Sequence, residues 1–204
     1  MKRLMLSSVP LYERTTMFRI YEHNVIPGLF QTAEYSAAML RYFVDFLDIP
    51  DDIEQAVETR MERQRILYSG QRRFVVVIEE QALLKPVGTD ETMIGQLDRL
   101  LAVMSLPRVL LAVMSLPRVS LGIIPLTRRT AFPSTGFWIY DDTLVGVETP
   151  TASLEITQPR EIALYGLMFT HLQESAVYGA AARNKVNEVL VNIAGATGLA
   201  VEHA

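Results

Sequence analysis

Apolar and polar positions change their spacing repeatedly along the chain, and each change predicts a new element. Residues 17–21 form a short apolar run that indicates a strand. The β-branched run 74–78 is typical of a central strand covered on both faces. Residues 33–47 carry large apolar side chains on nearly every side, so we expect a buried helix there, with Thr32 as its N-cap.

Residues 51–68 predict a second helix, which begins at a capping Asp51. At 100° per residue, Arg60 and Gln64 each fall within roughly 20° of the apolar Ile53. The side of this helix that should be buried therefore carries an arginine and an amide. A buried arginine requires a partner, because an isolated charge away from water is costly.

The second half of the chain alternates strand and turn signals and then ends in helices. The pattern predicts strands at 118–124, 136–140, 144–148 and 153–157, and helices from residue 89 or 90, at 159–177 and at 179–194. This order predicts a single α+β domain, with a mixed sheet of about five strands, helices packed on it, and helical N-terminal and C-terminal parts. We expect a linker or arm over 1–16, the domain over 17–195 and a flexible tail over 196–204.

A ten-residue segment occurs twice in tandem, because residues 100–109 are repeated without one change as 110–119. A perfect repeat this short is not an architectural repeat, whose copies are longer and diverge. We therefore interpret 110–119 as a surplus copy and expect it to bulge out as a loop or a helix extension. A loop is the cheapest solution, because ten residues preserve strand alternation but rotate a helix by roughly 80°.

Composition excludes several classes of site. The 204 residues include no cysteine and only three histidines, far apart, so neither a disulfide nor a metal site is expected, and no cofactor motif is present. The net charge of −4 and the scattered basic residues argue against direct nucleic-acid binding by this chain. No apolar run reaches the ~18 residues of a membrane helix. We expect a cytoplasmic protein.

A set of short motifs, in order along most of the chain, resembles one family. The matching residues are Glu22, 26–32 (Ile-Pro-Gly-Leu-Phe-Gln-Thr), Tyr35, Arg60, Arg63-Gln64, Glu80, Ala82-Leu83, Gly88, Met93, Gln96-Leu97, 116–125 (Leu-Pro-Arg-Val-Ser-Leu-Gly-Ile-Ile-Pro), Gly136-Phe137 and Val147-Glu148. Together they resemble the effector domain that follows the helix-turn-helix of actinobacterial Xre-type, WhiJ-like and antitoxin-like transcriptional regulators. The resemblance implies a domain that receives a signal or a small partner protein encoded nearby. The helix-turn-helix itself is absent, since the chain begins about where the linker to it would end.

Arg60 and Gln64 are the sharpest candidates for a site. They fit first a structural network with Glu22, Glu80 or Glu148 as counter-ion. The functional alternative is the floor of a pocket that recognises a carboxylate or another anion. Trp138 and Tyr140 share one face of a strand, as core residues or as a pocket wall. The candidate ligand-binding set is Glu22, Gln31, Tyr35, Arg60, Gln64, Glu80, Trp138 and Tyr140.

Three functions remain open from the sequence. The leading one is a signal- or partner-binding effector domain of a transcriptional regulator, paired with a small protein or assembled as a homodimer. The second is a stand-alone enzyme of the same fold that performs metal-free proton transfer or cyclisation in a biosynthetic pathway, with Glu80 and Glu148 as its acid and base. The third is a structural dimerisation domain, for which the apolar stripe of the helix at 179–194 serves as core or as partner face.

Overall fold

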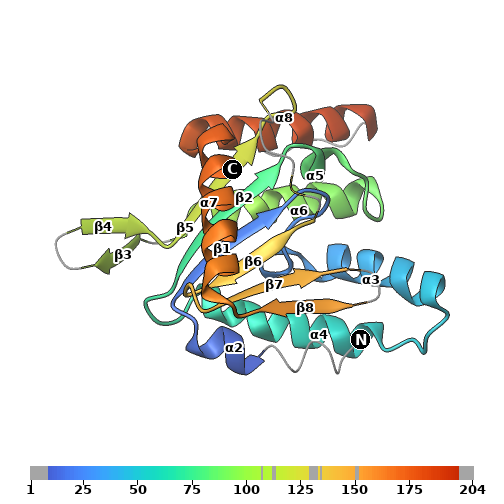
Figure 1. Ribbon diagram of the computed structural model, residues 1–204. Helices are drawn as coiled ribbons and strands as arrows, with labels where there is room; N and C mark the ends of the chain where they lie inside the picture. Colours follow the sequence, from blue (N-terminus) through green and yellow to red (C-terminus); the bar gives the residue numbers. More distant parts are fainter. Residues whose placement is uncertain are drawn as a thin grey trace.

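The computed structural model describes residues 9–106, 108–111, 114–128, 133, 135–149 and 152–197. Its main sheet has six strands in the order β5-β2-β1-β6-β7-β8 (Figure 1). The strands are β1 (Met17–Glu22), β2 (Arg73–Glu79), β5 (Val119–Ile124), β6 (Phe137–Tyr140), β7 (Leu144–Glu148) and β8 (Ser153–Ile156). The helices are α2 (Val9–Arg14), α3 (Ala33–Leu47), α4 (Ile53–Arg63), α5 (Gln81–Leu84), α6 (Asp90–Val103), α7 (Pro159–Ser175) and α8 (Gly179–Thr197), with 3-10 turns η1 (Gly28–Phe30) and η2 (Gln64–Leu67).

The sheet is mixed. Strands β1, β2 and β5 run parallel to one another, while β6, β7 and β8 form an antiparallel meander joined to β1. The predicted α+β class is confirmed, with six strands in the main sheet in place of about five. The β-branched run in β2 is indeed central, because β2 lies between β5 and β1 and has buried residues on both faces.

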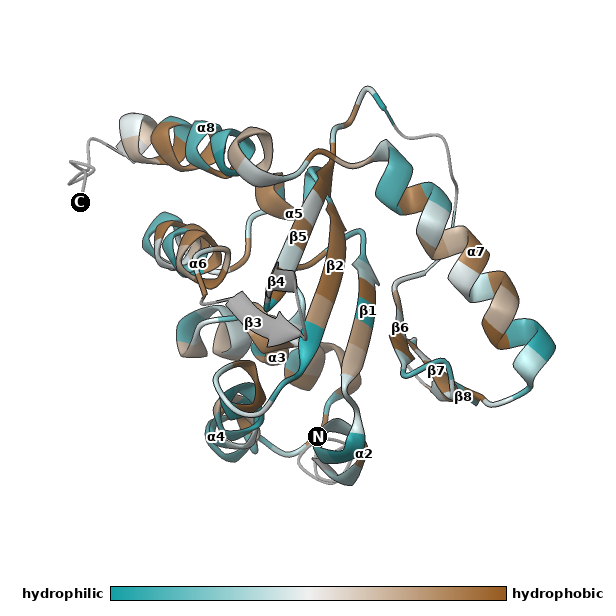
Figure 2. Cartoon of the chain, turned by 90° about the vertical axis from the view of Figure 1, so that its left-hand side faces the viewer, coloured by the Kyte–Doolittle hydropathy of each residue, from teal (hydrophilic) through white to brown (hydrophobic). Residues whose placement is uncertain are grey.

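The two faces of the sheet are covered unequally. Helices α3, α4, α6 and α8 lie on one side, and α7 lies on the other side against β5, β6 and β7 (Figure 2). The larger core cluster contains Phe18 and Val76 and faces the helix-rich side. The smaller cluster contains Tyr21 and Phe169 and lies beneath α7. Residues that alternate along β1 thus serve two separate cores.

Helix α3 begins as predicted but is not buried along its length. The Thr32 hydroxyl accepts a hydrogen bond from Tyr35 N–H, as an N-cap does. Leu40 is buried against α4. In contrast, Tyr42 and Phe46 are 64% and 63% exposed and stack on each other. The expectation of a buried helix was wrong because this helix packs against α4 on one side and leaves its other side in solvent.

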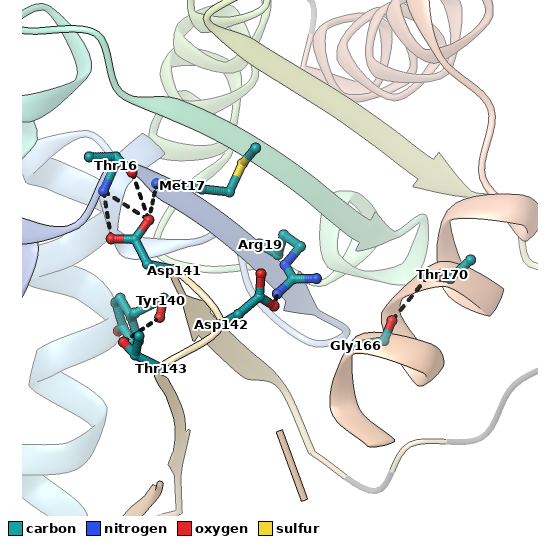
Figure 3. A network of polar contacts seen from close by, with 9 residues as sticks. All are labelled: Thr16, Met17, Arg19, Tyr140, Asp141, Asp142, Thr143, Gly166 and Thr170. Carbon is teal, nitrogen blue, oxygen red and sulfur yellow. Dashed lines mark hydrogen bonds and ion pairs between the residues drawn. The ribbon is translucent and has the colours of Figure 1, made fainter. Parts of the chain in front are cut away.

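The N-terminal segment is part of the domain rather than an arm. Residues Val9–Arg14 form helix α2, and Tyr12 is buried in the larger core; residues 1–8 lie outside the described residues. The end of this segment is fixed by Asp141 in the β6–β7 turn, whose carboxylate accepts hydrogen bonds from Thr16 and Met17 N–H (Figure 3). Asp141 and Asp142 both have positive φ, which short polar residues tolerate in a tight turn.

The C-terminal helix extends further than predicted. Helix α8 continues to Thr197, so residues 196 and 197 belong to the helix rather than to the expected tail. Residues 198–204 lie outside the described range. The sequence did not decide whether the apolar stripe of this helix packs in the core or contacts a partner. The stripe is buried, since Val186, Val189 and Leu190 are at most 6% exposed. This stripe packs into the larger core with α6.

The duplicated segment is divided between its neighbours and a hairpin. Leu100 and Val103 of the first copy are buried in α6, and Val119 of the second copy is buried at the start of β5. Between them, β3 (Arg108–Leu111) and β4 (Met114–Pro117) form a separate two-stranded sheet that projects from the domain (Figure 1). The projecting residues thus come from both copies, and each core position is filled once.

Within the described residues, no helix combines the length and the apolar character that a membrane crossing needs.

Candidate functional site

The amide of Gln31 is the centre of a network that joins η1, α3 and α4. Its Nε2 donates to Ile26 O at 2.7 Å, and its Oε1 accepts from Ser36 Oγ at 2.8 Å and from Arg60 Nη1 at 2.6 Å. The side chain is almost fully buried, so these bonds fix its orientation. Gln31 and Arg60, both in the candidate ligand-binding set, are therefore joined by a direct hydrogen bond.

Gln64 has a structural role in the same network. Its Nε2 donates to Gly28 O at 3.0 Å and to Gln31 O at 2.7 Å, and its Oε1 accepts from Arg99 Nη2 at 3.3 Å. Gln64 therefore joins the turn around Gly28 to the end of α4 and to α6. It leaves no polar atom of its amide for a ligand, because donor and acceptor are both used.

Arg60 is different, because its guanidinium is only partly satisfied. The side chain is half-buried against Gly28, and Nε is buried without a hydrogen-bond acceptor among the described residues. Burial and, to a smaller extent, the positive charge of Arg63 lower the pKa of Arg60 to about 10, against the opposing negative charge of Glu148. Arg60 therefore stays protonated at neutral pH and has donor capacity left.

Glu22 lies on the same side of the sheet, at the end of β1. Its Oε1 accepts a hydrogen bond from Trp138 Nε1 at 2.8 Å. Burial raises the pKa of Glu22 to about 7; the bond from Trp138 acts against this rise and the charge of Glu148 adds to it. This carboxyl is therefore close to half-protonated near neutral pH, and it can donate or accept a proton there.

Gly136 makes room for this carboxyl. A Cβ atom at position 136 would lie 2.4 Å from Glu22 Oε2 and 3.0 Å from Tyr21 O. No side chain can be accommodated at that distance unless Glu22 moves. The glycine therefore allows Glu22 to lie against β6, with Oε2 of Glu22 next to the backbone at position 136.

Aromatic rings form the wall between Glu22 and the arginines. Tyr12 stacks on Trp138 with ring centroids 5.9 Å apart, and its centroid is also 5.9 Å from that of Tyr140. The guanidinium of Arg63 lies over the Tyr12 ring at 5.4 Å. Burial raises the pKa of Tyr12 and of Tyr140, so both phenols are neutral at physiological pH.

Tyr35 belongs to the base of the site rather than to its surface. It is fully buried, and its hydroxyl accepts a hydrogen bond from Ile26 N–H at 3.3 Å. Burial raises the pKa of Tyr35, and the charge of Glu22 adds to the rise, so the two side chains lie within electrostatic range. Tyr35 thus supports the turn that carries Gln31.

Glu80 does not join these residues. Its carboxylate accepts from Leu126 N–H and from Lys185 Nζ, both at 2.9 Å. Burial acts to raise the pKa of Glu80, but these two hydrogen bonds and the charge of Lys185 outweigh it, so the pKa is lowered. The structure thus places Glu80 at the junction with α8, apart from the other predicted ligand-binding residues.

Glu80 and Glu148, the predicted acid and base, belong to strands that are not neighbours in the sheet. Glu80 follows β2 and Glu148 ends β7, and the strand order places these strands three positions apart. At roughly 4.8 Å per strand, the two backbones are about 14 Å apart. Glu148 is exposed and lies instead within electrostatic range of Arg60, Tyr12 and Glu22.

Seven of the eight predicted site residues therefore surround one region, on the face of β1 and β6 that is turned toward α4 (Figure 1). A family model described as a domain of unknown function, DUF5753, matches residues 9–188 of the chain. The chain belongs to the DUF5753 family. This match includes every residue of the region and begins at α2. Comparison with curated proteins and with solved structures finds no significant match.

Sequence reasoning missed three residues that shape this site in the DUF5753 domain. Tyr12 fell within the predicted linker, while Arg63 and Gly136 were named among the family motifs but not among the predicted site residues. A further signal existed for Arg63, which lies three residues after Arg60 and so on a neighbouring part of the helix surface. Among the described residues, no group of three or more acidic or histidine side chains is arranged to hold a metal ion.

Proposed function

We propose that this DUF5753 domain is the signal- or partner-binding effector domain of a cytoplasmic transcriptional regulator, and that Arg60 is its recognition residue. The resemblance to domains that follow an Xre-type helix-turn-helix supports the regulatory role. The main support for a binding site here is that Nε of Arg60 is buried and has no hydrogen-bond acceptor among the described residues. Such a donor is costly in an isolated domain and is satisfied when an acceptor binds.

The surroundings define what that acceptor would be. Arg60 and Arg63 supply positive charge on one side, and a carboxylate is the group that a guanidinium binds best, through two parallel hydrogen bonds. Trp138 is half-buried and presents part of its ring beside them. A small molecule with an acidic group next to an apolar or aromatic part fits this arrangement, and so does an acidic side chain of a small partner protein.

Glu22 would add pH-dependent recognition. With its pKa at about 7, the carboxyl is a hydrogen-bond donor when protonated and an acceptor when ionised. Binding of an anion next to it favours the protonated form, because the ionised form repels the incoming charge. Affinity for an acidic ligand is therefore expected to fall as the pH rises through neutrality.

Native mass spectrometry of the protein purified from its own host tests this proposal. We expect an additional mass on the unmodified protein, and loss of that mass in Arg60→Met. Arg65→Met is the matched control, because Arg65 is exposed on the same segment and pairs only with Glu62 among the described residues. A folded Arg60→Met protein that keeps the additional mass, or an unmodified protein without one, contradicts the proposal.

Arg60→Lys refines the result. Lysine retains the positive charge but not the planar pair of donors, so a ligand gripped by a guanidinium is weakened while the fold is retained. If Arg60→Met fails to fold, Arg60→Lys still reports on binding. Equal occupancy in Arg60→Lys and the unmodified protein would assign Arg60 to the internal network with Gln31 alone.

A further inference from the structure

Helix α7 carries two apolar stripes, and the domain uses only one of them. Ile162, Phe169 and Leu172 face the sheet and are buried in the smaller core. On the opposite side, Leu164 and Leu167 are 60% and 55% exposed, and no other described element lies over them (Figure 2). This exposure differs from α8, whose apolar stripe is buried. Helix α7 therefore has an apolar face without a partner among the described residues, as α3 does at Tyr42 and Phe46.

The outer stripe has the spacing of a helix-pairing seam. Arg160, Leu164, Leu167, His171 and Glu174 are all exposed and follow one another at intervals of four, three, four and three residues. These are the intervals of a heptad, in which two helices pack side by side. The apolar seam positions are Leu164 and Leu167 at the centre, and the outer three are polar or charged. Ala163 and Met168 flank the seam and are also exposed. No Asp, Glu, Lys or Arg occurs from Ile162 to Gln173, so the centre of the seam is uncharged.

The two ends of the seam carry opposite charges. Arg160 lies seven residues before Leu167, and Glu174 lies seven residues after it. Neither forms an ion pair within the part of the chain that the structure describes. The seams of two antiparallel copies are therefore complementary in charge. At each end of the pair, Glu174 of one copy lies opposite Arg160 of the other.

We propose that α7 is a homodimer interface, in which α7 of one copy packs antiparallel on α7 of a second copy about a two-fold axis at Leu167. The two Leu167 side chains meet at the axis, and each Leu164 lies near the region of Thr170 and His171 of the other copy. A parallel arrangement would oppose Arg160 to Arg160 and Glu174 to Glu174, and like charges in register are unfavourable. The proposal is independent of the ligand site, which lies on the other face of the sheet.

The size of the seam sets the expected affinity. A helix of 17 residues is about 25 Å long. A single pair of such helices buries less than the roughly 1,600 Å² of a standard stable interface. We therefore expect a reversible dimer with a dissociation constant in the micromolar range. Leu154 of β8, 51% exposed, lies on the same face as α7 because it pairs with the buried Val147, and it adds apolar surface on this side.

Charge reversal distinguishes this arrangement from any other. Sedimentation equilibrium of the full chain should show that Arg160→Glu and Glu174→Arg each weaken association by about tenfold, because each creates two like-charge contacts. The double variant Arg160→Glu with Glu174→Arg should restore it, since the two ends are again complementary. Leu167→Glu should abolish association. Each position is exposed, so circular dichroism should show unchanged folding.

A cysteine placed at the axis gives a second measurement, because the chain has no cysteine of its own. Under mild oxidation, Leu167→Cys should form a covalent dimer far faster than Asn187→Cys, which is exposed on α8. Equal rates for the two variants would overturn the proposal. So would an unmodified protein that stays monomeric throughout the micromolar range, or a double charge reversal that fails to restore association.

Discussion

The indole Nε1 of Trp138 donates a hydrogen bond to Oε1 of Glu22 at 2.8 Å, which links the single tryptophan of the chain to a carboxyl with a pKa of about 7. The two residues lie on adjacent strands, β6 and β1. Ionisation of Glu22 therefore changes the electrostatic environment of the indole directly. The intrinsic fluorescence of the protein should report on this part of the site without a label.

Glu22→Gln should remove part of the pH dependence of stability. The folded pKa is raised from 4.5 to about 7, so folding is favoured by the protonated form, and this contribution is lost as the pH rises from 4.5 through 7. At about 1.4 kcal/mol per unit, the loss is up to roughly 3 kcal/mol. Urea unfolding at several pH values should show Glu22→Gln to be more stable than the unmodified protein above pH 7 and similar to it below 4.5.

Glu80→Gln should behave in the opposite way and serves as the matched control. Its pKa is lowered by Leu126 N–H and Lys185, so the contribution to stability is present above the unfolded pKa and is lost as the pH falls through the folded pKa. The variant should lose about 1 kcal/mol at neutral pH and nothing in acid, where both proteins are protonated. Variants at Glu22 and Glu80 with the same sign at neutral pH would contradict the assigned environments.

Gln64→Leu should be strongly destabilising. The leucine has a similar volume, but it leaves Gly28 O and Gln31 O without the donor that Gln64 supplies. Buried carbonyls that lose their donor cost about 1–3 kcal/mol each. Thermal unfolding should show the loss, and Gln55→Leu, on the exposed face of α4, should show none.

Gly136→Ala should disturb the Glu22–Trp138 bond without touching either side chain. The added methyl group would lie 2.4 Å from Glu22 Oε2, so the carboxyl must move. Overpacking of this kind costs about 1–3 kcal/mol. We expect lower stability together with a changed Trp138 emission spectrum. Gly195→Ala, which meets nothing within 4 Å, is the matched glycine control. It should leave the emission spectrum unchanged and should not lower stability, because alanine is favoured over glycine in a helix.

Removal of one copy of the duplicated segment should leave the domain intact. Deleting 108–117 or 110–119 yields the same sequence, because the copies are identical. The deletion removes the β3–β4 sheet, while the residues that replace Arg118 and Val119 before β5 are the same two residue types. Thermal unfolding and the Trp138 spectrum should be unchanged. A deletion variant that fails to fold would show that the hairpin contributes to the core.

The sequence predicted the features that depend on local chemistry. The cap by Thr32 is confirmed, and so is the central position of β2, because a threonine before a helix and a β-branched run act through their nearest neighbours. Helical periodicity also placed Arg60 and Gln64 on the inner side of α4. That prediction needed only the rotation per residue, and both side chains reach Gln31, as expected from the sequence.

The remaining features depend on strand order and on distant contacts. The separation of Glu80 from Glu148 follows from the position of β6 and β7 beyond β1, which no local pattern encodes. Tyr12 is buried because it stacks on Trp138, a residue more than a hundred positions later. The exposure of Phe46 could not be predicted either, since an apolar helix does not reveal on which sides it meets other elements.

The junction between α6 and β5 makes this gene tolerant of replication slippage. Helix α6 ends within the upstream copy and β5 begins with Val119, the last residue of the downstream copy, so gain or loss of one unit leaves the sequence of both elements unchanged. Selection for a stable fold therefore does not act on the number of ten-residue units. A surface element of new length can arise here in a single step, and the hairpin offers a natural place to attach a probe or a tag.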